Sequence, residues 1–311
     1  MHHIIFMNHN TVYKYKVDPE LYDITKTEDG YINIYKNQLK HRSVNDIKMA
    51  NVVGYNGIDM DTIEFRYNEY LIHGSDLDLS DLKLTHIPEL LFQKQFANIK
   101  MLFICDNKIS GKIDLRQLHH LKVFDCSVNK LEILPLLPAN IEEINCKNNQ
   151  IISIDELKYT HLLRIDASFN KITHIPAIKT LISCTCENNE ITTIEMMPNL
   201  VSLDCRNNKL TDIPFFEKLT KLECDNNMIK YITSMPYLEH LYCTNNNLTS
   251  LTDFKSLVHI NFVDTWIEEL PYYPKLNECI CTCDRLKRIS DQYKITYTVS
   301  ANNILSIVFH K

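Results

Sequence analysis

Glycine is scarce in this chain of 311 residues, with only 5 copies, and there is a single tryptophan. The glycine-rich loops that cradle phosphates and dinucleotides are absent, as are G-x-S-x-G and H-E-x-x-H. No nucleophile, general base or cofactor motif can therefore be assigned. We predict that the protein is not an enzyme, has no catalytic residues and needs no cofactor.

Positive charge is not in excess either, because the formal net charge is −6. Without a basic field the chain has no electrostatic attraction to nucleic acid or anionic lipid. No apolar run approaches the roughly 18 residues that a membrane span requires. The first residues, MHHIIFMNHN, lack the basic lead and small-residue cleavage site of a secretory signal. We expect neither nucleic acid nor membrane as a partner.

A repeat of 19 residues is the main feature that is present. Four consecutive segments read LISCTCENNEI, LVSLDCRNNKL, LTKLECDNNMI and LEHLYCTNNNL, and the first leucine of each is position 1. Apolar residues recur at positions 4, 6, 11 and 14. Position 9 is asparagine at Asn107, Asn129, Asn149, Asn170, Asn189, Asn208, Asn227 and Asn246, then Thr265 and Asp284. The spacings are 22, 20 and 21 residues, followed by 19 six times.

The spacing predicts a stack of short parallel strands. Positions 4 and 6 point to the same face of a strand, and stacked copies bury that face against each other. The asparagine amides at position 9 can bond the backbone of adjoining turns and form a structural ladder. About eight residues remain for the return path, where prolines recur at positions 15 and 18, so we expect extended rather than helical backbone there.

The pattern resembles the leucine-rich-repeat superfamily, and the short, proline-marked repeat is similar to the bacterial effector type. The resemblance implies an α/β repeat protein: a curved solenoid with a concave parallel β-sheet, a mostly non-helical convex side and caps at both ends. Some effector families append a catalytic ubiquitin-ligase domain. Only about 22 residues follow the repeats here, so we expect none.

Three regions are predicted. Residues 1–72 form a head of mixed α/β character, with strands over 11–17 and 62–72 and a helix starting near Ser43. Residues 73–290 hold about 11 repeats, with a short convex helix near 89–98. Residues 291–311 alternate like two strands and form a hairpin cap.

Cysteine occupies the core slots of the repeat, as Cys126, Cys146, Cys186, Cys205, Cys224, Cys243 and Cys281 at position 6 and Cys184 and Cys279 at position 4. We interpret these as reduced packing residues of a cytoplasmic protein, which is the host cytoplasm if the source is a virus; disulfides are the alternative. Cys279, Cys281 and Cys283 lack the C-x-x-C spacing of zinc knuckles, so no metal site is assigned. Cys105 and Cys283 are the thiols expected to be exposed.

Position 5 faces outward on the concave sheet and carries an acidic stripe. Asp125, Asp166, Asp204 and Glu223 are candidate partner-binding residues, in a groove for a basic or polar protein. The alternative is a solvated face, with Lys147, Arg164, Arg206 and Lys221 placed to neutralise the acids.

Aromatic residues near the C-terminal end offer a second candidate, with Tyr242 and Trp266 as partner-binding residues. The competing interpretation, which we favour for Trp266, is packing under the terminal cap.

We therefore predict a monomeric, non-catalytic protein-protein interaction module that holds an unidentified protein on its concave sheet. A viral or host-directed effector is one setting for it. The alternatives are a structural scaffold component, or an adaptor with an unrecognised activity in the head.

Overall fold

The computed structural model describes residues 2–8, 11–17, 22–26, 32–36 and 76–310, apart from 93 and 301. The chain divides into two compact units, Met1–Asn56 and Gly57–Lys311.

The described residues of the first unit form two antiparallel strand pairs. Strand β1 (His2–Asn8) pairs with β2 (Thr11–Val17), and β3 (Tyr22–Lys26) pairs with β4 (Ile32–Lys36). The strand expected over 11–17 is β2. The helix expected near Ser43 and the strand expected over 62–72 lie outside the described residues.

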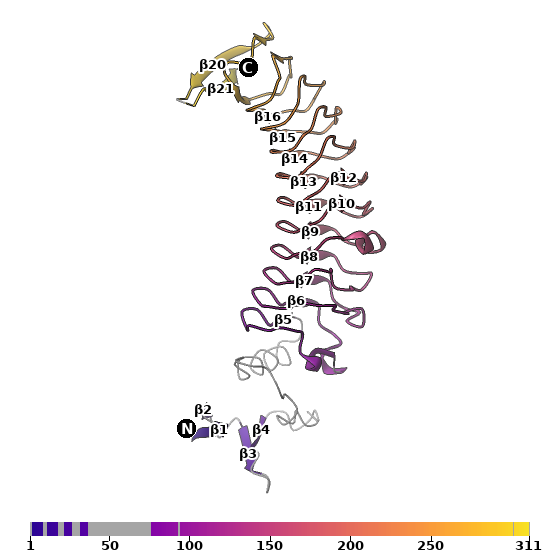
Figure 1. Ribbon diagram of the computed structural model, residues 1–311, viewed down its shortest axis with the longest axis vertical. Coiled ribbons are helices and arrows are strands. Elements are labelled where there is room, and N and C mark those ends of the chain that lie inside the picture. The colour runs from indigo at the N-terminus through magenta and orange to yellow at the C-terminus, as the bar shows by residue number, and fades with distance from the viewer. Residues whose placement is uncertain are drawn as a thin grey trace. The chain divides into compact units, whose positions relative to one another are not determined.

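The second unit is built on a sheet of thirteen strands, which Figure 1 shows as a single stack. Eleven of these strands are mutually parallel: β5 (Asp76–Asp78), β6 (Met101–Phe103), β7 (Val123–Asp125), β8 (Glu143–Asn145), β9 (Arg164–Asp166), β11 (Ser183–Thr185), β13 (Ser202–Asp204), β14 (Lys221–Glu223), β15 (His240–Tyr242), β16 (His259–Asn261) and β18 (Glu278–Thr282). Each comes from one repeat, so the predicted parallel-sheet solenoid is confirmed.

The register follows the 19-residue period. Leu203 pairs with Leu222, and Leu222 pairs with Leu241. Positions 1, 4, 6 and 11 point into the core and are buried along the array. Because each strand is only three residues long in most repeats, a single repeat has one inward side chain per strand and depends on both neighbours to bury it.

The return path, positions 12–19, is extended, as the prolines predict. It forms two small parallel sheets, β10 (His174–Ile175) with β12 (Thr193–Ile194) and β17 (Glu269–Leu270) with β19 (Arg288–Ile289). The only helical turns in the described residues are the 3₁₀ segments η3 (Glu89–Phe92), η4 (Lys94–Phe96) and η5 (Asp155–Tyr159). The first two lie where a short convex helix was expected.

Two antiparallel strands continue the sheet at its C-terminal end. Strand β21 (Ile304–His310) pairs with β18, and β20 (Lys294–Val299) pairs with β21 and forms the outer edge. Ile307 and Phe309 are buried, and Tyr293 packs on Phe309 with 4.3 Å between ring centroids. Burial raises the pKa of Tyr293 to about 12. Whether this hairpin protects the core as a cap stays a prediction.

Candidate interaction surface

The position 9 asparagines are hydrogen-bonded as a ladder along the stack. Asn227 is typical: its Nδ2 donates to the carbonyls of Cys205 (3.0 Å) and Cys224 (3.1 Å), and its Oδ1 accepts from Leu210 N at 2.9 Å. The same bonds recur at Asn107, Asn129, Asn149, Asn170, Asn189, Asn208 and Asn246. One amide therefore joins the turns of two successive repeats, which holds the strands in register.

The residue at position 8 adopts the left-handed backbone conformation, with φ between 52° and 56° in nine consecutive repeats, eight of which have the ladder asparagine at position 9. Asn and Asp tolerate this region well and occupy seven of the nine positions. Val128 and Phe169 are the exceptions, and both side chains are exposed. A β-branched or bulky residue is strained in this conformation, because its Cβ approaches the following carbonyl.

The concave face consists of the outward columns at positions 3 and 5. The pairing register places Asp125, Asn145, Asp166, Thr185, Asp204, Glu223, Tyr242, Asn261 and Ile280 in one row at position 5. Adjacent strands are about 4.8 Å apart, so side chains in neighbouring repeats are within reach of one another. The predicted acidic stripe is thus one column of the sheet.

The aspartates of this stripe bond to their own turns. The Oδ1 atoms of Asp125, Asp166 and Asp204 accept hydrogen bonds from the backbone N–H two residues later, at 2.9, 3.0 and 3.2 Å. Such Asx turns satisfy a backbone donor where the strand ends. This turn accounts for Asp or Asn at position 5, and Asn145 accepts the same bond from Lys147 N at 3.2 Å.

Basic side chains neutralise part of the remaining charge. Arg206 donates to both carboxylate oxygens of Asp204, at 2.9 and 2.6 Å, and this pairing raises the arginine pKa. Lys221 lies 3.1 Å from Glu223. Arg164 pairs with Glu143 instead of an acid of the stripe. Asp204 is also only 7% exposed, so its carboxylate is poorly accessible to a ligand.

A cluster of aromatic and polar side chains occupies the same face over β14–β18. We call it the tyrosine-histidine cluster, and it consists of Lys221, His240, Tyr242, His259 and Glu278. The rings of Tyr242 and His259 lie 5.0 Å apart, those of His240 and His259 lie 6.3 Å apart, and Lys221 Nζ is 5.9 Å from the Tyr242 ring.

The histidine at the centre of this cluster is fixed on one side only. His259 Nδ1 lies 3.1 Å from Glu278 Oε2, while its Nε2 has no hydrogen-bond partner within the described part of the chain. The tyrosine-histidine cluster therefore combines a partly exposed aromatic ring with a polar atom that lacks a hydrogen-bond partner among the described residues. The acidic stripe has no such combination.

Trp266 does not pack under the terminal hairpin, so that expectation is wrong. Its side chain is 56% exposed, and the Arg285 guanidinium stacks 3.7 Å from the ring centroid. Tyr273, Phe262 and Phe309 are buried aromatic residues in the C-terminal part of the chain. Trp266 lies at position 10, outside the strand columns, so it does not extend the tyrosine-histidine cluster.

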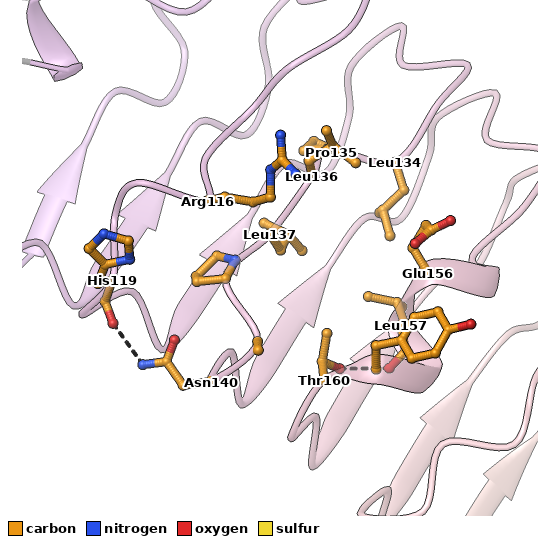
Figure 2. Close-up of a pocket in the computed structure, with 13 residues that line it drawn as sticks. Arg116, His119, Leu134, Pro135, Leu136, Leu137, Asn140, Glu156, Leu157 and Thr160 are labelled. Atoms are coloured by element: carbon orange, nitrogen blue, oxygen red, sulfur yellow. Dashed lines mark hydrogen bonds between the residues drawn. The ribbon is translucent and has the colours of Figure 1, made fainter.

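The sequence pattern does not predict a cavity that the structure has on the return path. It has a volume of about 480 Å³ and lies between the return segments of successive repeats, with Arg116, Leu134, Leu137 and Tyr159 among its lining residues (Figure 2). Arg116 is ion-paired to Asp114, which lowers the aspartate pKa to about 2. The cavity occurs where the repeats depart from 19 residues and η5 is inserted; no periodic signal marks it.

All eleven cysteines are free, and all lie in the described residues. Nine are buried, whereas Cys105 and Cys283 are partly exposed, as predicted. Burial raises the pKa of Cys126, Cys205 and Cys224, which keeps these thiols protonated and unreactive. No group of three His, Cys, Asp or Glu side chains suited to a metal ion occurs among the described residues. No helix among them is long and apolar enough to cross a membrane.

The stacked parallel strands, the asparagine ladder and the extended return path define a leucine-rich-repeat protein. The chain is similar to a leucine-rich-repeat protein of Acanthamoeba polyphaga mimivirus, with 26% identity over 159 residues, which are 43% of this chain and 35% of the viral protein. No protein-family model matches the chain.

Solved structures with the same fold include YopM from Yersinia enterocolitica, with a TM-score of 0.66 and 23% identity over 78% of this chain and 54% of that one. YopM from Yersinia pestis, described as a leucine-rich effector protein, gives a TM-score of 0.59 and 22% identity over 78% and 72% of the two chains. The chain thus spans about a third of the viral relative and about half of the first YopM. At these identities the likeness establishes the fold.

Proposed function

We propose that the protein is a non-catalytic interaction module that binds another protein on its concave face. The observation that carries this proposal is the tyrosine-histidine cluster, which lies on a paired sheet with the partly exposed Tyr242 ring against His259. Aromatic residues dominate binding energy at protein interfaces, because they bury a large area at a low entropic cost. A site on paired strands is also preorganised, so little ordering is needed on binding.

The tyrosine-histidine cluster is a better centre for the site than the acidic stripe. Asp125, Asp166 and Asp204 are committed to backbone turns, and Asp204 is also paired with Arg206. Charges that are already compensated contribute little to association. We place the acidic stripe and Trp266 at the periphery of the site, where they affect the rate of encounter more than its affinity.

The setting that fits best is a reducing compartment such as the cytoplasm. Free, buried thiols at positions 4 and 6 suit such a compartment. The similarity to a viral leucine-rich-repeat protein and to bacterial effectors supports a role inside a host cell.

Affinity capture with matched variants tests the proposal. The unchanged chain is immobilised next to a Tyr242→Ala/His240→Ala variant and a Met196→Ala/Phe215→Ala control, whose exposed side chains lie on the return path. We expect the first variant to bind the specific partner roughly thirtyfold more weakly, since a hot-spot residue contributes about 2 kcal/mol. The control should retain as much as the unchanged chain.

A third variant separates the acidic stripe from the cluster. Asp166→Asn, Asp204→Asn and Glu223→Gln together remove charge but keep the hydrogen-bond acceptors of the turns. We expect a loss smaller than about threefold at physiological salt. If this variant loses more partner binding than Tyr242→Ala/His240→Ala, the acidic stripe is the centre of the site instead of the cluster. Equal capture by all variants would favour the scaffold alternative, or a site in the head.

A further inference from the structure

At the C-terminal edge of the sheet, β20 has backbone groups that bond to no other described residue. β20 is the outermost strand of the thirteen, next to β21. Every one of its six residues is exposed. Natural proteins usually block such edges with proline, bulges or central charges. β20 reads KITYTV and has one charge, at its first residue.

The hydrogen-bond pattern identifies which groups are free. Ser300 N donates to Ile304 O at 2.9 Å, so these two residues form a hydrogen-bonded pair at the hairpin end of the ladder. Antiparallel ladders alternate, so the N–H and C=O groups of Thr298, Thr296 and Lys294 also point towards β21. Those of Ile295, Tyr297 and Val299 consequently point away from β21, towards solvent.

The same three residues form an uncovered apolar row. Tyr297 pairs with Ile307, which is buried and pairs with Cys279 of the core. Because paired residues share a face, Ile295, Tyr297 and Val299 lie on the core side of the sheet. They are nevertheless 37%, 66% and 50% exposed. The apolar face of the solenoid thus continues one strand beyond the side chains that cover it.

We propose that β20 is a self-association edge, which pairs antiparallel with β20 of a second copy of this chain. With Tyr297 opposite the partner's Tyr297, Ile295 faces Val299 and Thr296 faces Thr298. All apolar residues then fall on one face and all threonines on the other, with no like charges directly opposed. This register also brings together the residues whose backbone groups are free, so each pair can exchange two hydrogen bonds. The strand thus complements itself in its side-chain pairs and in its backbone hydrogen bonds, as a symmetric dimer requires. This surface is separate from the tyrosine-histidine cluster.

Sedimentation velocity of the full chain over a range of micromolar concentrations tests the proposal. We expect a dimer. Tyr297→Lys places two like charges opposite each other at the symmetry axis and should weaken association by roughly a hundredfold. Thr298→Lys adds the same charge one residue away on the opposite face and should remain dimeric. Tyr297→Pro removes only an N–H that points to the free edge, so it should yield a folded monomer.

A mixing experiment distinguishes self-pairing from other contacts. Tyr297→Lys and Tyr297→Glu chains should each be monomeric alone and form a heterodimer when mixed, because opposite charges then meet at the axis. Circular dichroism checks that each variant is folded. A monomeric unchanged chain, a dimer that survives Tyr297→Lys and Tyr297→Pro, or equal loss with Thr298→Lys would overturn the proposal; the edge would then be free, covered by another part of the chain or paired with a different protein.

Discussion

The strand-and-turn segment, positions 1–11, and the return segment, positions 12–19, differ in how strictly they repeat. The strand-and-turn segment has the same register and the same ladder bonds from Asn107 to Asn246. The return segment varies, with extended pairs at β10–β12, a 3₁₀ turn at η5 and an isolated bridge between Asp114 and Leu136.

The difference follows from where backbone groups are satisfied. In the strand-and-turn segment a buried side-chain amide completes the hydrogen bonds of two repeats, and any slip would leave several groups unpaired. In the return segment most polar groups can reach water, so insertions cost little. The strand-and-turn segment must therefore keep the repeat pattern, whereas the return segment can vary in length and conformation.

The strongest test of this comparison is a pair of asparagine substitutions. Asn227→Leu leaves the Leu210 N–H and three carbonyls without the partner that the amide supplies, and we expect a loss of about 3 kcal/mol in the free energy of unfolding. Asn199→Leu removes surface hydrogen bonds of the return segment and should change it by less than about 0.5 kcal/mol. Urea denaturation measures both. Equal losses would contradict the distinction between the two segments.

The packing of the core gives a second test. Cys205 is fully buried beneath the strand, so Cys205→Leu overfills a narrow interior and should destabilise the protein by about 2 kcal/mol. Met197→Leu conserves volume at a buried site of the return segment and should cost less than about 1.5 kcal/mol. Thermal unfolding of the two variants measures the contrast; a Cys205→Leu protein as stable as the unchanged chain would mean that the strand core has spare room.

The residues with left-handed backbone at position 8 provide a third test, in which one substitution should stabilise the protein. Val128→Asn should raise the free energy of unfolding by about 1 kcal/mol, because asparagine tolerates φ near 53° and valine does not. Asn207→Val is the reciprocal change and should lower it by a similar amount. If both variants destabilise, the exposed Val128 side chain makes a contact that outweighs its strain.

The smallest effect concerns pH. Burial raises the pKa of Asp225, so the folded chain holds this proton more tightly than the unfolded chain. Stability should therefore fall as pH rises from the unfolded to the folded pKa. Asp225→Asn keeps the acceptor for Thr244 N, removes this decline and should stabilise the neutral protein by less than about 0.5 kcal/mol, after allowance for solvent screening.

Glu268 of the return segment provides the opposite sign. Its hydrogen bond from Lys287 lowers its pKa, so the stability it contributes is lost as pH falls through the folded pKa. Chemical denaturation between acidic and neutral pH compares Asp225→Asn with Glu268→Gln. Parallel pH profiles for the two variants would rule out the assigned signs.

Much of the fold could be predicted from the sequence, because period-19 spacing identifies both the inward positions and the asparagine column. Side-chain contacts between neighbouring repeats are harder to predict from the sequence, although they follow the same 19-residue period. Trp266 stacks on Arg285, and His259 bonds Glu278, each one repeat ahead. The predicted burial of Trp266 under the hairpin is wrong, because Arg285 covers the ring at the surface instead.

The ion pair of Asp204 and the cavity on the return path depend on side-chain and backbone geometry that the repeat pattern does not specify. Asp204 was a candidate for partner binding, but its rotamer and that of Arg206 close an ion pair within the sheet. The cavity beside Leu137 and Tyr159 results from irregular repeat lengths, whose effect on the return path depends on how neighbouring segments pack. The acidic stripe, the tyrosine-histidine cluster and the head remain predictions about function.

The ladder bonds have a consequence for how such a molecule can change length. Asn189, Asn208 and Asn227 make equivalent bonds one period apart, so the junction between two units is nearly the same wherever it occurs. Loss or duplication of a whole unit by recombination would rejoin matching surfaces and change the length of the concave sheet by one strand width, about 4.8 Å. The sheet can thus lengthen or shorten in discrete steps, while the residues of the remaining repeats stay the same.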